Sequence, residues 1–251
     1  MSPASQQQLP SQLVPPSTVI ALAYQVVLRQ LTSRSRIIGL GLLALVAPVS
    51  GFALGSADAS LDDSVRLIAS VGLGLVLPVV SLVFAGAAIG DLRDDKTLVY
   101  LWLRPMDRWP IVVGAALAAG TLAAPITIIP IVAAAILTGA GNGIVAGTLL
   151  ATIVGLVAYV AVFTLFGVWL KRFIVWGLAY ILIWEGFIAQ AGAGVARIAL
   201  RKYTRSILVD RTGADLDLAD FSLAMAVVVP FVVAVVAVAV ASWRLSNQDI
   251  D

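Results

Sequence analysis

The residue types in this chain limit the chemistry that it can perform. Its 251 residues include no Cys and no His. Without Cys there is no disulfide, thiolate nucleophile or thiolate metal site. Without His there is no Ser-His-Asp triad, no imidazole metal site and no His-ligated haem. These absences remove most hydrolases and metalloenzymes. Because no other nucleophile–base or metal constellation is visible either, we expect a chain that is not an enzyme, has no catalytic residues, and binds no metal or cofactor itself.

One carboxylate, Glu185, lies inside the apolar run 173–191. A charged side chain at the bilayer centre costs about 2.5–3.5 kcal/mol on insertion scales, so it is a candidate for function. Four roles are open to Glu185: lining an aqueous path, pairing with a cationic substrate, remaining protonated, or hydrogen-bonding within a helix interface. Tyr180 and Trp184 are the accompanying pathway candidates. They belong to an aromatic series with helical spacing: Phe173, Trp176, Tyr180, Trp184 and Phe187.

The most patterned polar stretch is residues 91–110. Asp94 or Asp95 suits a helix N-cap, and Pro105 cannot continue a helix. The stretch therefore predicts a short helix, whose apolar face would be formed by Leu98, Leu101 and Trp102. Such a helix can pack under its own bundle, lie on a membrane, or dock into a groove on another protein.

The composition predicts a polytopic membrane protein. Hydrophobic residues make up 61% of the chain and charged residues 12%, where a soluble domain has about 25% charged residues. A net charge of +2 gives no indication of nucleic-acid binding. Runs of roughly 20 apolar residues predict an all-α fold with six transmembrane helices. The predicted spans are 37–55, 67–90, 111–138, 144–170, 173–191 and 222–242.

The remaining segments are polar or amphipathic. Residues 1–17 are polar and Pro-rich and predict a disordered tail, and residues 243–251 form a second tail. Residues 18–36 predict an amphipathic helix lying in the membrane interface; the alternative is an extension of the first span. Residues 192–221 predict an amphipathic segment on the outer face. Arg197, Arg201 and Arg205 follow one another there at intervals of four residues.

The basic residues predict that both termini are cytoplasmic. With six crossings and the N-terminus inside, ten of the 16 Lys and Arg residues lie inside. The inside set is Arg29, Arg34, Arg36, Arg93, Lys96, Arg104, Arg108, Lys171, Arg172 and Arg244; the outside set is Arg66, Arg197, Arg201, Lys202, Arg205 and Arg211.

Residues 90–114 resemble the signature of type-2 ABC exporter permeases. The matching residues are Gly90-Asp91, Asp94-Asp95-Lys96-Thr97-Leu98, Leu101-Trp102-Leu103-Arg104-Pro105-Met106-Asp107-Arg108-Trp109 and Ile111-Val112-Val113-Gly114. The family usually has Gly before the Thr and Lys after the later Gly, where this chain has Lys96 and Ala115. The order of an N-terminal elbow helix, six spans, a long outer segment and a short tail also resembles the family.

The resemblance implies the transmembrane subunit of a bacterial plasma-membrane ABC exporter. In the family, the segment between spans 2 and 3 carries a coupling helix that contacts a separate ATP-binding subunit. The corresponding residues are Asp94, Asp95, Thr97, Leu98, Leu101, Trp102, Arg104, Pro105 and Arg108. The chain contains no Gly-Lys dipeptide and hence no P-loop, so ATP and Mg would be bound by the partner ATPase. The other expected partners are a second permease subunit, identical or paralogous, and membrane lipids. The family's outer segment partly re-enters the membrane near the exit of the pathway.

Two other functions remain open from the residues. One is a proton-coupled secondary carrier that uses Glu185. The other is a membrane scaffold that transports nothing. The sequence does not identify a substrate, because apolar spans, aromatic residues and outer arginines suit lipids, hydrophobic drugs or peptides equally.

Overall fold

The computed structural model describes residues 15–94, 108–186, 199–216 and 221–247. Within these ranges the chain forms only helices and the turns between them, which confirms the all-α prediction for these residues. Segments labelled η are π-helical and have wider turns than an α-helix. The helices in chain order are α1 (Pro16–Leu31), α2 (Arg34–Ala44), α3 (Val46–Ser56), α4 (Leu61–Leu67), η1 (Ile68–Val76), α5 (Leu77–Ser81), η2 (Leu82–Gly86), α6 (Ala87–Asp94), α8 (Trp109–Leu137), α9 (Asn142–Trp169), α10 (Phe173–Ala179), η3 (Tyr180–Glu185), α12 (Leu200–Thr212) and α13 (Leu223–Ser246).

Among the described residues, five helical stretches are long and apolar enough to cross a membrane, so the chain is a multi-pass membrane protein. Each stretch corresponds to a predicted span with shifted ends. The stretches are Arg34–Ser56, Leu61–Asp91, Trp109–Leu137, Gly143–Trp169 and Leu223–Ser246.

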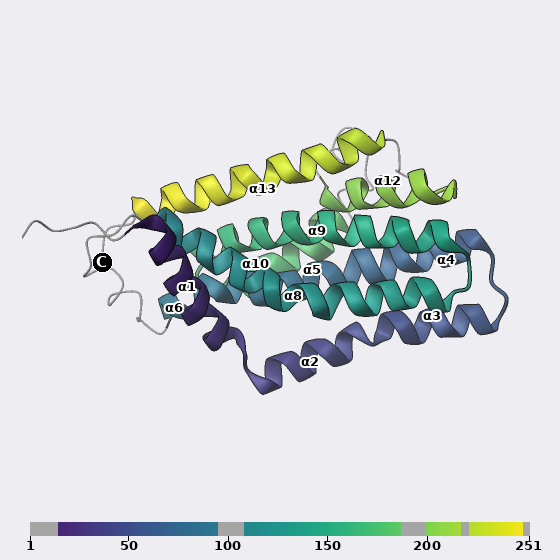
Figure 1. The fold of residues 1–251 in the computed structure, drawn as a ribbon, viewed down its shortest axis with the longest axis horizontal. Coiled ribbons are helices and arrows are strands. Elements are labelled where there is room, and N and C mark those ends of the chain that lie inside the picture. The colour runs from purple at the N-terminus through teal and green to yellow at the C-terminus, as the bar shows by residue number, and fades with distance from the viewer. Residues whose placement is uncertain (1–14, 95–107, 187–198, 217–220, 248–251) are drawn as a thin grey trace, which may run out of the picture.

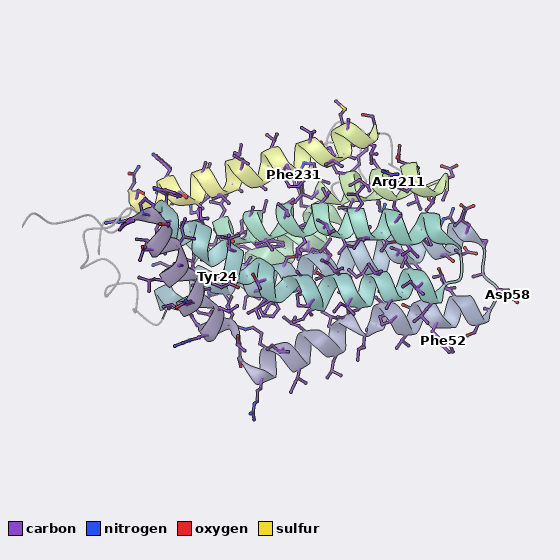
Figure 2. The ribbon with its side chains drawn as sticks, viewed as in Figure 1. Tyr24, Phe52, Asp58, Arg211 and Phe231 are labelled. Atoms are coloured by element: carbon purple, nitrogen blue, oxygen red, sulfur yellow. The ribbon has the colours of Figure 1, made fainter. Side chains whose placement is uncertain are left out.

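The bundle has two distinct ends (Figure 1). Helix α1, the start of α8 and the C-terminal end of α13 lie at one end, here called the α1 end. The turn between α3 and α4 lies at the opposite end. Tyr24 on α1 and Asp58 in this turn mark the two ends in Figure 2.

The most buried helices are the second and fourth candidate spans. In Leu61–Asp91 and Gly143–Trp169, 61% of the most apolar 18-residue stretch is buried inside the bundle. The corresponding share in Arg34–Ser56 and Leu223–Ser246 is 22%. The outer helices expose large apolar side chains such as Phe52 of α3, which projects away from the bundle (Figure 2). Lipid tails are as apolar as these side chains, so their exposure in a bilayer carries no hydrophobic penalty.

The predicted fifth span, 173–191, is not one long helix in the described part of the chain. The stretch Phe173–Glu185, made of α10 and η3, is shorter than the five candidate spans. At about 1.5 Å per residue it extends about 20 Å, which is less than the roughly 30 Å hydrocarbon core. Part of the prediction, residues 187–191, lies outside the described residues.

Two short helices lie one after the other alongside α9. The stretch α10–η3 lies along the C-terminal half of α9, and α12 continues along its N-terminal half toward the opposite end. In order along the pair, the contacts are Tyr180 with Phe166, Glu185 with Tyr159, Thr204 with Gly155, and Arg211 with Gly147. Since the α9 residue numbers fall steadily, the two short helices together extend along most of the length of α9.

The helix ends in the structure refine three predicted segments. The N-terminal amphipathic helix is expected over 18–36, but α1 ends at Leu31 and Arg34 begins α2. The hydroxyl of Thr32 donates a 2.6 Å hydrogen bond to the Leu28 carbonyl, an interaction that competes with continued helix. At the other terminus, α13 continues to Ser246, so the tail expected from residue 243 begins as helix. In the outer segment, α12 ends at Thr212 and is followed by Gly213, whose φ of 68° is left-handed.

Small residues bring the central helices into close contact. Gly86 and Gly90, which are four residues apart, both lie against the ring of Phe173. The backbone carbonyl of Gly86 also lies against Gly167 of α9, where a Cβ atom would overlap it. Side chains at these positions would separate α9 from η2.

We predict that Gly167→Val destabilises the folded protein while Gly39→Val does not. The valine at 167 would overlap backbone atoms of Gly86, and such overpacking costs about 1–3 kcal/mol. No atom lies within 4 Å of a Cβ placed at Gly39 on α2. Thermal unfolding in detergent measures the difference, and equal melting temperatures for the two variants would contradict the proposed contact.

Candidate functional site

The candidate site is centred on Glu185, whose side chain is 4% exposed. Its Oε2 accepts hydrogen bonds from the Tyr159 hydroxyl at 2.6 Å and from the Arg201 amide at 3.1 Å. Its Oε1 accepts from the Tyr180 hydroxyl at 2.9 Å and from the Leu200 amide at 3.2 Å. An ionised carboxylate has about four acceptor positions, so these bonds nearly saturate it.

The two amides bound by Glu185 belong to the N-terminus of α12. The first amides of a helix have no partner inside the helix, and in a low-dielectric interior they need one from elsewhere. The residue before the helix, Ala199, has no side chain that can cap it. Glu185 provides the cap from η3, and its negative charge also suits the positive end of the helix dipole.

An aromatic cluster positions the two tyrosines. Tyr159 of α9 stacks on Phe163, with ring centroids 5.8 Å apart. Tyr180 of η3 packs edge-on against Phe163 and Phe166 at 6.1 and 5.8 Å. The rings hold both hydroxyls toward Glu185 from different helices, so the carboxylate joins α9, η3 and α12.

A second π-helical segment contacts the site through Arg201. The guanidinium of Arg201 lies against Gly74 of η1, so close that a Cβ at residue 74 would be 2.8 Å from one of its nitrogens. Gly74 therefore provides the space for this side chain. The site is bordered by η1 and η3, and π-helical turns are frequent at functional sites.

Helix α12 is also attached to the start of α13. The rings of Tyr203 and Phe221 stack with centroids 4.6 Å apart, and Lys202 Nζ lies 4.9 Å from the Phe221 ring centroid. The Phe221 amide donates to Ser206 Oγ at 3.4 Å. A displacement of α12 would therefore be transmitted to α13.

The geometry indicates a structural role for Glu185, whose carboxylate connects η3 to the N-terminus of α12. Its acceptor positions are already used by four donors of the chain, which favours hydrogen bonding in a helix interface among the roles open to it. Among the described residues no group of three or more Asp and Glu residues is placed to hold a metal ion.

The structure brings together only some of the predicted site residues. Of the pathway candidates, Tyr180 bonds Glu185, while the hydrogen bonds to Glu185 do not involve Trp184. The aromatic series does not share one environment: Phe173 is buried and Trp176 is 58% exposed. Of the outer arginines, Arg201 and Arg205 lie on α12, with Arg201 beside Glu185, and Arg197 lies outside the described residues.

Most of the predicted coupling helix lies outside the described residues. This applies to Asp95, Thr97, Leu98, Leu101, Trp102, Arg104 and Pro105. The two residues that border this set are described: Asp94 ends α6, and Arg108 precedes α8. Arg108 Nη1 donates to the carbonyls of Leu245 at 2.9 Å and Ser246 at 3.1 Å, near the end of α13.

Sequence analysis did not identify Tyr159, Gly74 or the α12 amides as parts of the site. The one signal for Tyr159 is that it is the single tyrosine in the apolar run 144–170. The sequence does not indicate which backbone amides belong to the site, because every residue except proline carries a backbone N–H group.

No family model matches the chain, and no curated protein is significantly similar to it.

We predict that Glu185→Gln loosens α12. A glutamine would present an NH₂ group to two of the four donors, and a buried unsatisfied donor costs about 1–3 kcal/mol. Tyr159→Phe removes one donor and should cost about 1 kcal/mol. Hydrogen exchange of the α12 amides and thermal unfolding measure both effects.

Tyr24→Phe is the matched control for Tyr159→Phe. The Tyr24 hydroxyl makes one exposed 3.4 Å bond, to Thr121, so its removal should leave stability and α12 exchange unchanged. Unaltered α12 exchange in Glu185→Gln would show that the carboxylate does not hold this helix.

Proposed function

We propose that this chain is the membrane-spanning permease subunit of an ATP-driven ABC exporter in a bacterial plasma membrane. It crosses the membrane six times, with α10–η3 beginning the fifth crossing, α12 belonging to the outer segment that re-enters the membrane, and α1 serving as the elbow helix. A separate ATPase subunit docks on residues 94–108, and a second permease subunit completes the pathway. The chain itself supplies no ATPase site.

The observation that carries the proposal is the placement of α12. The resemblance in residues 90–114 implies an outer segment that partly re-enters the membrane before the last span. Helix α12 begins beside Glu185 and Tyr159, well inside the bundle, and runs from there toward the opposite end. This placement agrees with the outer segment that the resemblance implies, and it therefore supports the proposal.

Polar contacts at the α1 end support the docking role of residues 94–108. On one side of the segment, Asp91 of α6 pairs with Arg36 of α2 at 2.8 Å. On the other side, Arg108 bonds the last carbonyls of α13. A force applied to the segment would thus reach α2 and α13 as well as its two neighbouring helices.

The charge distribution supports cytoplasmic termini. At the α1 end, described basic side chains outnumber the acidic one: Arg29, Arg34, Arg36, Arg108, Lys171, Arg172 and Arg244 against Asp91. Toward the opposite end, with α12 included, the two signs balance: Asp58, Asp62, Asp63, Asp210 and Asp215 against Arg66, Arg201, Lys202, Arg205 and Arg211. An excess of Lys and Arg marks the cytoplasmic side.

A proton-coupled carrier would require Glu185 to bind and release protons along the transport pathway. The four donors of the chain that hydrogen-bond this carboxylate favour a fixed structural connection between η3 and α12 instead. The carrier predicts transport that continues without ATP, whereas the exporter predicts transport that stops.

We predict that an ATP-binding subunit co-purifies with the full-length chain after gentle solubilisation of native membranes. Mass spectrometry of the isolated complex identifies its subunits, and ATPase assays of the same sample test for hydrolysis. A complex that contains no ATP-hydrolysing subunit would count against the exporter and leave the scaffold as the better assignment.

We predict that Leu98→Ala combined with Trp102→Ala uncouples ATP hydrolysis from transport while the membrane bundle remains folded. Together these residues supply most of the apolar face proposed for docking, and burial of each is worth about 1.5–3 kcal/mol. ATPase association and substrate efflux from proteoliposomes measure the effect.

The matched control is Leu182→Ala combined with Trp176→Ala on α10–η3. These side chains are 61% and 58% exposed on the outside of the bundle, so their loss should leave coupling intact. Equal transport and equal ATPase association in both double variants would disprove docking through Leu98 and Trp102.

A further inference from the structure

A lateral groove runs between α8, α9 and α13. Its volume is about 840 Å³, and its walls are almost entirely apolar. Trp109, Gly120 and Thr121 line it on α8, and Phe231 and Ser242 line it on α13. Phe231 marks this part of α13 in Figure 2.

The groove occupies half the height of the membrane. On α8 its lining extends from Trp109 to Thr121, and on the antiparallel α13 from Ser242 back to Phe231. Both stretches correspond to about 17–18 Å at about 1.5 Å per residue. One leaflet contributes about half of the roughly 30 Å hydrocarbon core. The groove therefore begins at the α1 end and extends about as far as the bilayer centre.

The hydroxyl groups in the groove are already bonded to their own helices. Thr121 Oγ1 donates to the Leu117 carbonyl at 2.8 Å, and Ser242 Oγ donates to the Val238 carbonyl at 2.7 Å. Neither hydroxyl proton is left for a ligand. The surface thus suits a hydrocarbon chain better than a polar molecule.

The mouth of the groove carries positive charge. Arg108 lies next to Trp109 and reaches the carbonyls of Leu245 and Ser246, so it connects α8 to α13 at this end. Tryptophan favours the level of lipid head groups, and an excess of basic residues favours anionic lipids. An apolar channel as long as one leaflet, with a basic mouth, matches a phospholipid in chemistry and in length.

We propose that this groove binds an acyl chain of an anionic phospholipid from the leaflet at the α1 end. The phosphate lies near Arg108 and Trp109, and the chain follows α8 and α13 toward Phe231. The length of the groove, which is close to that of one acyl chain, and its position at the basic α1 end favour a lipid over a helix of a second copy. The inference holds whether or not the chain is an exporter subunit.

Gly120 provides a way to fill the groove without disturbing the bundle. No atom lies within 4 Å of a Cβ placed there, so the position faces open space. Gly120→Phe should occupy this space, and Val235→Trp should narrow the groove from α13, where Val235 is 70% exposed. Gly41→Phe is the matched control, because a Cβ at this α2 glycine also meets no atom within 4 Å.

The experiment uses the full-length protein in nanodiscs that contain phosphatidylglycerol with a photoreactive acyl chain. After illumination, mass spectrometry locates the labelled peptides. We expect labelling concentrated on residues 109–121 and 231–242 in the wild type and in Gly41→Phe. In Gly120→Phe and Val235→Trp it should fall by about tenfold, as for a loss of about 1.4 kcal/mol. Unlabelled phosphatidylglycerol should compete better than phosphatidylcholine.

Four outcomes would overturn the proposal. Labelling spread evenly over all exposed helix faces would show ordinary lipid contact without a site. Labelling that is undiminished in both filling variants, each checked for native melting temperature, would place the lipid elsewhere. Protein–protein cross-links through residues 109–121 would show that a second copy covers the groove, and equal competition by the two lipids would remove the anionic specificity.

Discussion

The structure depends on how backbone amides find hydrogen-bond partners where a helix is interrupted inside an apolar bundle. Water is absent there, so each backbone amide released by the interruption needs a partner within the protein. Glu185 supplies that partner for Leu200 and Arg201, while Tyr159 and Tyr180 donate to the same carboxylate. A charged group that is costly by itself is thereby stabilised by four donors, and the start of α12 is fixed within the bundle.

Other features of this half of the molecule follow from the position of α12. With its N-terminus fixed, Arg201 lies against Gly74 of η1, and Tyr203 stacks on Phe221 just before α13. Phe173 and Trp176 divide between the interior and the outside surface although both lie on α10, because they occupy different faces of this helix.

The α1 end is organised differently, by charges at helix termini. Arg36 pairs with Asp91, and Arg108 binds the final carbonyls of α13. These contacts join helices that are distant in sequence, around the segment proposed to receive the ATPase. Arg108 also precedes Trp109, which lines the lateral groove, so the proposed motor contact and the proposed lipid site share one side chain.

The sequence by itself determined the membrane class, the approximate bounds of five spans and the candidacy of Glu185. Those properties follow from composition and from the length of apolar runs, which each segment carries independently of the others. It did not determine that the fifth apolar run is a shorter helix, or that Tyr159 and the α12 amides bind Glu185. Only the tertiary structure decided these points, because a buried carboxylate is satisfied by whichever donors packing brings to it, and those donors come from residues 26 and 15 positions away.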